Sequence, residues 1–563
     1  HHNDIAEYIM QKYMPKESQN DNSNLFSYAI KYHNYHYLPS DFSNDFLFYK
    51  LCKYDHITLV SLVMNEVNVN KVYSIKKNIE KLKKVIEKEK TPLYIAAERG
   101  NSEIVNLLLS QENIDINKKL TTKCTYFYKD EIYERSALHI AIEKRNFQTA
   151  KILLNSNKID VNAKTNYKIK KSGYNETQEK SPLYLSVENE AEEVVQSLLL
   201  HKNIEINAKF LSNEIGTFTK YYLEKSPLFL AIEKGLENIA SILLMNPKTD
   251  VNSQMTKSYE AGKFNSLKKE APIHLAISNN ELNCFNQFLK REDIDLTCLK
   301  IQKFNLWKKI EEKVLTPLQI AIIKGRTSMV KALLEKQNID INNVSKIAKH
   351  EFDNKTMKTM FSNGYKYLII DNQRTALHFA VENNDLEIVK LLLERPDIDA
   401  NKKKIFSFST INNTLLGSDI EQIRGALETL KKERDEKKKN ENNEEEEETV
   451  QIEGDGEQHT LESKMINEQS ALHLAIKNNN FDIVEALMGS QKVDINSVST
   501  NNFNGYFIEE ERAEKEVIKY TDLHIAAELG TPEIIELIAS QKEIDINAKH
   551  IEESESIKSV AGP

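Results

Sequence analysis

The chain has 563 residues, of which 40% are hydrophobic and 29% are charged, and its formal net charge is −9. Because a single hydrophobic core stops growing at roughly 250–300 residues, this length excludes one compact domain and predicts several domains or a repeat array. The few glycines and prolines exclude a collagen-like chain, and four cysteines without a CxxC pair exclude a disulfide scaffold, which predicts reduced thiols and a cytoplasmic location.

At the start of the chain, residues 1–42 carry apolar side chains at helical spacing, and we expect them to form an amphipathic helical cap. Residues 43–90 resemble a degenerate copy of the repeat that follows. Phe48, Leu51 and the segment Val67–Asn70 stand about 45 residues before equivalent residues of the next segment.

From Thr91 onward a short motif, Thr-Pro-Leu-Tyr-Ile-Ala-Ala in its first copy, recurs along the chain. Its copies begin at Thr91, Ser136, Ser181, Ser226, Ala271, Thr316, Thr375, Ser470 and Thr521. The first five steps are 45 residues each, and such a fixed period indicates stacked structural repeats.

The sequence pattern of each repeat predicts two short helices followed by an extended segment. In the first clear copy, Pro92 suits the opening turn of a helix, and Gly100 suits the left-handed conformation that ends it. Most copies hold Gly or Asn at the position of Gly100, but Arg145 and Glu190 break the pattern, which predicts turns that are strained or differently built. A second helix is expected over residues 103–110, with four buried side chains: Ile104, Val105, Leu107 and Leu108.

The repeats close on Asp-Ile-Asn or a variant of it, first at residues 115–117. The opening motif, the paired small residues, the Gly turn, the leucines of the second helix and this close together resemble the ankyrin repeat. The resemblance covers nine clear units from Thr91 to Asn547. It implies an all-α repeat solenoid of stacked helix-turn-helix units with extended β-hairpin fingers. The repeats would occupy residues 91–401 and 470–563, with the second group truncated. The resemblance also assigns hydrogen bonds between neighbouring units to the motif histidines: His139, His274, His378, His473 and His524.

The extended segments are longer than in an ankyrin unit of about 33 residues. Their alternating β-branched, aromatic and charged residues predict long hairpin fingers, aligned as a comb along one edge. The fingers at 118–135, 163–180, 208–225, 253–270, 298–315 and 343–374 have a summed charge of +14. We therefore predict an acidic protein partner, bound by Tyr126, Tyr128, Lys168, Lys170, Lys171, Phe218, Tyr221, Lys300, Lys303, Phe304, Trp307 and Lys308. Alternatively, the aromatic residues pair across the hairpins and the lysines protect exposed strand edges.

Residues 402–469 form a charged insertion between repeats. Residues 419–439 have apolar residues at three- and four-residue spacing, which predicts a charged helix or coiled coil. Glu444–Glu448 is an acidic block that we expect to be disordered. The last finger, residues 497–520, is also acidic.

The sequence contains no GxGxxG, GxxxxGK[ST], HExxH or GxSxG motif, which predicts a non-catalytic protein without cofactor, metal or small-molecule substrate. No apolar stretch approaches the ~18–20 residues of a membrane span. Nucleic acid is a less favoured partner, because the acidic block and the acidic last finger would repel it.

The ankyrin resemblance implies a protein–protein interaction scaffold or adaptor, with partners on the concave face built by the first helices and the fingers. Two alternatives remain open. The chain could be the ankyrin portion of a larger membrane-linked or cytoskeletal protein. It could also self-assemble, with the basic fingers of one molecule binding the acidic block of another.

Overall fold

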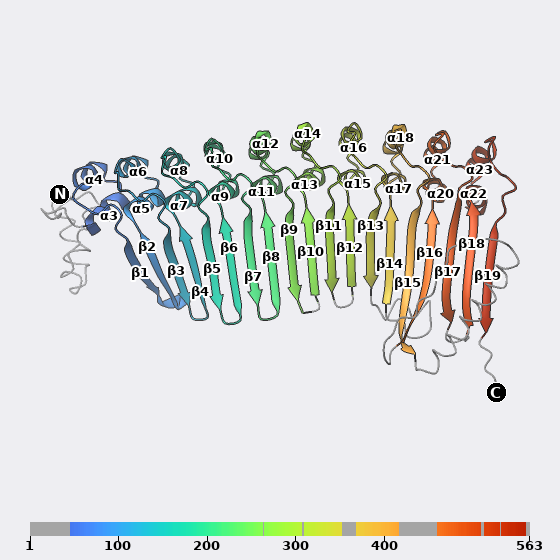
Figure 1. Ribbon diagram of the computed structural model, residues 1–563, viewed down its shortest axis with the longest axis horizontal. Coiled ribbons are helices and arrows are strands. Elements are labelled where there is room, and N and C mark those ends of the chain that lie inside the picture. The colour runs from blue at the N-terminus through green and yellow to red at the C-terminus, as the bar shows by residue number, and fades with distance from the viewer. Residues whose placement is uncertain are drawn as a thin grey trace. The chain divides into compact units, whose positions relative to one another are not determined.

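The computed structural model describes residues 45–262, 264–306, 309–351, 367–415, 459–507, 512–529 and 531–558, in two compact units that meet between Tyr259 and Glu260. The predicted cap at 1–42, the predicted helix at 419–439 and the acidic block lie outside the described residues. In each unit, the helices gather at one end of long strands (Figure 1).

In the first unit, every repeat contributes an inner helix, an outer helix and strands. The inner helices are α3 (Asp45–Lys53), α5 (Pro92–Arg99), α7 (Ala137–Glu143), α9 (Pro182–Glu188) and α11 (Pro227–Glu233). The outer helices are α4 (Ile57–Val63), α6 (Ser102–Leu109), α8 (Phe147–Leu154), α10 (Glu192–Leu199) and α12 (Glu237–Met245). The strands are β1 (Tyr73–Ile79), β2 (Lys84–Lys90), β3 (Leu120–Tyr126), β4 (Lys129–Arg135), β5 (Thr165–Lys171), β6 (Tyr174–Lys180), β7 (Phe210–Gly216), β8 (Thr219–Lys225) and β9 (Met255–Ala261), which ends in the second unit.

The second unit repeats this order. Its inner helices are α13 (Pro272–Asn279), α15 (Pro317–Ile323), α17 (Ala376–Glu382), α20 (Ala471–Lys477) and α22 (Asp522–Leu529). Its outer helices are α14 (Leu282–Lys290), α16 (Thr327–Leu334), α18 (Leu386–Glu394), α21 (Phe481–Met488) and α23 (Pro532–Ala539). Its strands are β10 (Phe264–Glu270), β11 (Lys300–Leu306), β12 (Lys309–Leu315), β13 (Ser345–Glu351), β14 (Tyr367–Arg374), β15 (Lys404–Leu415), β16 (His459–Gln469), β17 (Val498–Phe507), β18 (Arg512–Thr521) and β19 (Ile551–Lys558).

The helix ends follow from the motif. The Thr91 hydroxyl accepts a hydrogen bond from the Tyr94 amide, which caps α5. Gly100 ends that helix at φ 79°, in the left-handed region. Arg145 and Glu190 adopt the same left-handed conformation at φ 59° and 61°, so these two turns are built like the others, in a region that residues other than glycine seldom adopt.

The prediction of an all-α fold is wrong, because the fingers join into antiparallel sheet. In the first unit β1 to β8 pair in chain order, and the pairing between β4 and β5 joins two different fingers. In the second unit β10 to β19 pair in the same manner. Strands lie about 4.8 Å apart and packed helices about 8–10 Å apart, so one hairpin per repeat matches the spacing of stacked helix pairs. Neighbouring fingers therefore form hydrogen bonds with one another and do not stand apart as a comb.

The ends of the charged insertion at 402–469 belong to this sheet. Lys404 to Leu415 of β15 pair with His459 to Gln469 of β16, with a shift of register between Asn412 and Leu415. The insertion therefore begins and ends as a hairpin finger longer than the seven-residue fingers of the first unit.

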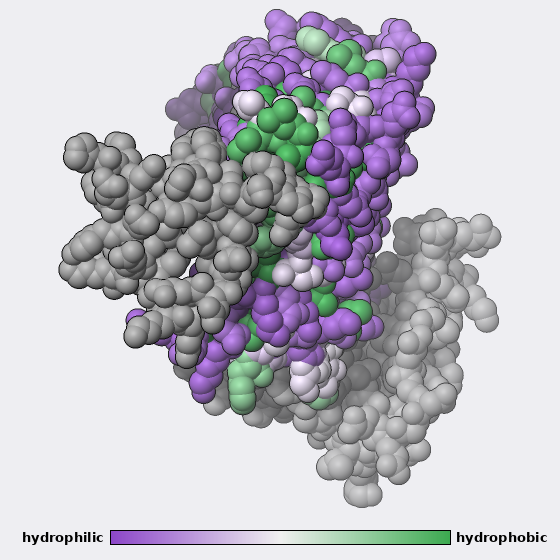
Figure 2. Space-filling view, turned by 90° about the vertical axis from the view of Figure 1, so that its left-hand side faces the viewer, coloured by the Kyte–Doolittle hydropathy of each residue, from purple (hydrophilic) through white to green (hydrophobic). Residues whose placement is uncertain are grey.

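Stacking of neighbouring repeats buries the helices. In α6, Ile104, Val105 and Leu108 are buried as expected, but Leu107 is only half-buried. Its counterpart in α4, Leu62, is 68% exposed. Figure 2 looks at the end of the first unit formed by α3, α4 and β1, where hydrophobic side chains gather toward the top. Because α6 has a packed outer helix on each side, Leu107 is better covered than Leu62.

Candidate functional site

Side chains alternate between the two faces of a sheet. In the first unit, Arg135 and Lys180 reach the inner helices from one face of the sheet. We call this the front face and the opposite one the back face. Arg135 Nη1 lies 2.5 Å from Glu143 Oε2, and Lys180 Nζ lies 2.8 Å from Glu188 Oε1. These ion pairs neutralise the charges where the sheet meets the helices.

Half-buried tyrosines cross the front face from β3 to β8: Tyr126, Tyr133, Tyr167, Tyr174 and Tyr221. The rings of Tyr133 and Tyr167 stand opposite each other with centroids 4.6 Å apart. Lys84 Nζ and Lys129 Nζ lie 4.4 and 5.0 Å from the centroid of the Tyr126 ring. These front-face lysines therefore contact aromatic rings, which attract cations through their faces.

Carboxylates accompany the tyrosines on the front face. Glu131 Oε1 forms an ion pair with Lys129 Nζ at 2.7 Å. Glu176 and Glu214 stand directly opposite each other on β6 and β7. The Tyr174 hydroxyl lies 3.2 Å from Glu176 Oε2 and 2.9 Å from Glu214 Oε2. Burial and the hydrogen bond to Glu214 raise the pKa of Tyr174, so its hydroxyl remains a donor at neutral pH.

Aromatic side chains are exposed at the tips of two fingers. Phe127 and Tyr128, between β3 and β4, are 88% and 60% exposed, and Phe218, between β7 and β8, is 83% exposed. Large exposed apolar side chains that lie together often mark interaction surfaces. The tips therefore extend the aromatic surface beyond the tyrosine row.

The structure distributes the predicted binding residues of the first unit over three regions. Tyr126, Tyr221 and Lys171 lie on the front face, where Lys171 Nζ is 5.6 Å from the centroid of the Tyr128 ring. Lys168 and Lys170 lie on the back face, because they alternate with Lys171 along β5. Tyr128 and Phe218 are at the tips.

The predicted residues of the second unit are also divided. Lys300 forms an ion pair with Glu270, which is 1% exposed, so this lysine already has a partner within the fold. Lys303 alternates with Lys300 along β11 but points to the opposite face, where its Nζ lies 2.7 Å from Glu312 Oε1. Phe304 is 36% exposed and packs edge-on against Phe264, with the ring centroids 5.1 Å apart. Trp307 and Lys308 lie outside the described residues.

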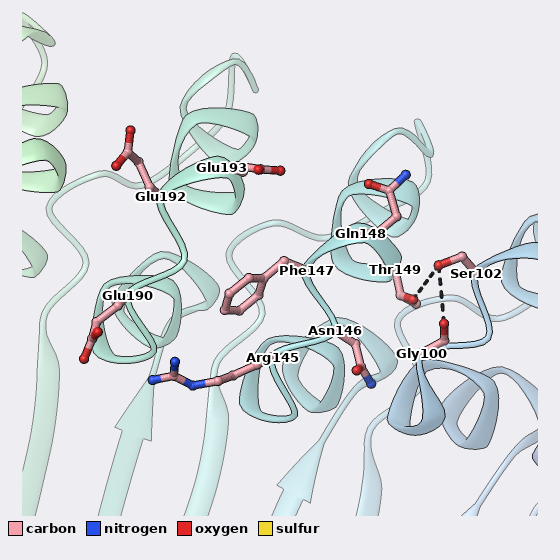
Figure 3. A pocket seen from close by; sticks show the side chains of 10 residues that line it. All are labelled: Gly100, Ser102, Arg145, Asn146, Phe147, Gln148, Thr149, Glu190, Glu192 and Glu193. Atoms are coloured by element: carbon pink, nitrogen blue, oxygen red, sulfur yellow. Dashed lines mark hydrogen bonds between the residues drawn. The ribbon is translucent and has the colours of Figure 1, made fainter.

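A groove of about 580 Å³ lies among the helix turns of the first unit. Figure 3 shows its lining side chains, which come from three successive repeats and include Arg145, Phe147 and Glu190. Its carboxylates have partners: Glu190 lies 3.8 Å from Lys234 Nζ, and Glu193 lies 2.9 Å from Lys151 Nζ. The groove is thus a gap between successive turns in which these carboxylates already have lysine partners.

None of the four cysteines forms a disulfide, and all four are buried. Within the described ranges, no group of three or more His, Cys, Asp or Glu side chains is arranged to hold a metal ion. In the same ranges, no helix combines the length and the apolar character that crossing a membrane requires.

Sequence reasoning missed part of the front face, namely Tyr167, Tyr174, Glu176 and Glu214. Their spacing carried a signal, because the 45-residue period places β4 beside β5 and β6 beside β7 once neighbouring fingers pair. Treating the fingers as separate hairpins hid this relation.

Comparison with known families agrees with the repeat geometry. A family model of ankyrin repeats in three copies matches residues 49–165, 120–210, 254–345 and 443–550, which together exceed half of the chain, and a model of the single ankyrin repeat matches residues 372–403. No curated protein matches the sequence. Ankyrin repeats are in general protein–protein interaction modules and are typically non-catalytic. The chain belongs to the ankyrin-repeat family.

Proposed function

We propose that this protein is a non-catalytic scaffold or adaptor that binds a protein partner on the front face and the finger tips of its first unit. The observation that carries the proposal is that one face of the sheet holds five half-buried tyrosines, while Phe127, Tyr128 and Phe218 are exposed at the finger tips. Aromatic side chains with one polar end are the residues that most often dominate the energy of protein interfaces.

The charge of the front face also supports a protein partner. Lys84 and Lys129 contact the Tyr126 ring, Lys129 also pairs with Glu131, and Arg135 pairs with Glu143. A surface with both signs of charge and aromatic anchors suits a folded or extended protein better than a uniformly charged polymer such as nucleic acid. The acidic partner, the self-assembly and the cytoplasmic location expected from the sequence stay predictions.

The experiment compares two surface variants of the whole chain in affinity capture from cells. Tyr128→Ser combined with Phe218→Ser removes two exposed tip anchors. Ile215→Ser, which is 56% exposed on the back face of β7, is the matched control. We expect the tip variant to lose a partner that the wild type and Ile215→Ser both retain, at unchanged melting temperature. Equal capture by all three proteins would contradict the proposed surface.

A further inference from the structure

Two carboxylates on the front face differ from the other acidic side chains around them. Glu176 of β6 and Glu214 of β7 are directly opposed, and like charges in this position destabilise a sheet. Among the described residues, neither carboxylate lies within 4.0 Å of a Lys, Arg or His side chain, whereas Glu131 on the same face is paired with Lys129. The pair therefore carries negative charge that the fold does not neutralise.

The hydrogen bonds at this pair are too few to satisfy both groups. Tyr174 has one phenolic proton, yet its oxygen lies within hydrogen-bond distance of both carboxylates, so it can donate to only one at a time. Gln178 Nε2 donates to Glu176 Oε1 at 2.7 Å. No hydrogen bond to Glu214 Oε1 is present among the described residues, which leaves that oxygen for an external donor.

Aromatic rings stand on two sides of the pair. Tyr221 of β8 is directly opposite Glu214. Tyr174 is two residues before Glu176 on β6, so both side chains lie on the same face. Gly216 stands opposite Tyr174 and has no side chain of its own, and the Thr219 hydroxyl lies beside its Cα. The neighbouring cations are engaged elsewhere, since Lys171 Nζ lies 5.6 Å from the centroid of the Tyr128 ring and Lys257 Nζ lies 5.7 Å from that of Tyr221.

We propose that Glu176, Glu214, Tyr174 and Tyr221 form a subsite for a lysine or arginine side chain of the protein partner. The inference rests on the proposed function, because it needs a partner on the front face. A cation between the carboxylates would relieve their mutual repulsion and contact the tyrosine rings, which are the two interactions that a buried ammonium or guanidinium group requires. Charge complementarity thus selects a basic segment at this point of the surface, although the fingers as a whole carry more lysine than glutamate.

The probe is a fluorescein-labelled extended peptide of alternating serine and lysine, with arginine and glutamate versions for comparison, and binding to the full chain is followed by fluorescence anisotropy. The test variant is Glu176→Gln with Glu214→Gln. The charge-matched control is Glu87→Gln with Glu179→Gln, because both of these carboxylates lie on the back face and already have lysine partners. We expect the test variant to bind the lysine or arginine peptide about ten-fold or more weakly and the control to lose little affinity. The glutamate peptide should not bind.

Equal losses in the two variants would mean general attraction to an acidic chain, and no loss in the test variant would mean that the pair is not the subsite; either result overturns the inference. A second readout is stability, since removing the opposed charges should leave the melting temperature unchanged or higher, and a lower one would show a structural role instead. Partner capture separates the two proposals. If partner capture depends on Tyr128 and Phe218 but binding of the peptide does not depend on Glu176 and Glu214, only the proposed subsite is contradicted. If capture does not depend on the tips, the proposed function fails whatever the peptide result.

Discussion

Asn117 and Asp160 join two successive repeats, because the Asp160 amide donates a hydrogen bond of 2.8 Å to Asn117 Oδ1. The amide group of the same side chain donates to the Lys158 carbonyl at 2.7 Å. One donor and one acceptor on a single planar group match the two backbone groups of the next repeat, which explains why most repeats close on Asn, although Thr297 stands at this position in one of them. The same two bonds recur at Asn70, Asn162, Asn207, Asn342, Asn401 and Asn496.

Asn117→Ala should therefore loosen one junction between repeats. Both bonds are partly solvated, so we expect a loss of about 1–2 kcal/mol in the free energy of unfolding, measured by urea denaturation. Asn175→Ala, at an exposed position of β6, is the control and should change stability little. If the two variants unfold alike, these asparagine hydrogen bonds between repeats do not stabilise the stack.

Buried histidines should make the fold sensitive to acid. Burial lowers the pKa of His139, His274 and His378 to about 4, against an ordinary value near 6.5. Because the pKa of each histidine is lower in the folded than in the unfolded chain, protonation favours the unfolded chain. The fold therefore has its full stability above about pH 6.5 and loses stability as the pH falls toward 4. Each histidine accounts for about 3 kcal/mol of this loss at most.

The chain supplies the matching substitution. Gln319 occupies the histidine position of its repeat, where its Oε1 accepts from the Thr316 amide at 3.0 Å and its Nε2 donates to the Asn343 carbonyl at 2.7 Å. His139 makes the same two contacts with Ser136 and Ala163. Changing the three histidines to Gln should preserve stability at pH 7.5 and flatten the decline of the melting temperature between pH 6.5 and 4. An unchanged pH profile would contradict this origin of acid sensitivity.

Lys300 should matter for stability more than for binding. Burial raises the pKa of Glu270, but hydrogen bonds from Lys268 and Lys300 outweigh it and leave that pKa below its ordinary value. Lys300→Met removes one of the two cations from a buried carboxylate, and we expect a loss of about 2–4 kcal/mol in thermal or urea unfolding. Adding Glu270→Leu should restore part of it. Lys303→Met is the control, because its side chain is 50% exposed and its pair is worth less than about 1 kcal/mol.

Arg145→Gly should stabilise the first unit by about 1 kcal/mol, because a side chain at φ 59° is strained and glycine is not. Gly100, Gly235 and Gly325 occupy the same position in other repeats at φ 79°, 68° and 62°. Lys144→Gly, one residue earlier at φ −88°, should instead destabilise, since it only adds freedom to the unfolded chain. Calorimetric melting of both variants tests the opposite signs.

Local patterns were enough to predict the helices. The pairs of helices, their caps and the left-handed turn at Gly100 depend on residues within one or two turns of each other, so a single repeat contains the information. The residues of the recurring motif then identified the ankyrin family by resemblance, which the family models confirm.

Only the tertiary structure decided what the fingers become and which residues they bring together. Pairing between β4 and β5, or between β6 and β7, depends on how closely the helix pairs stack, and no residue within one finger encodes that spacing. The same pairing sets the faces. Lys170 and Lys171 are adjacent in the chain and equal in charge, but strand alternation sends them to opposite sides of the sheet. By contrast Glu176 and Glu214 are 38 residues apart in number and become direct neighbours, because each sits at the matching position of adjoining strands.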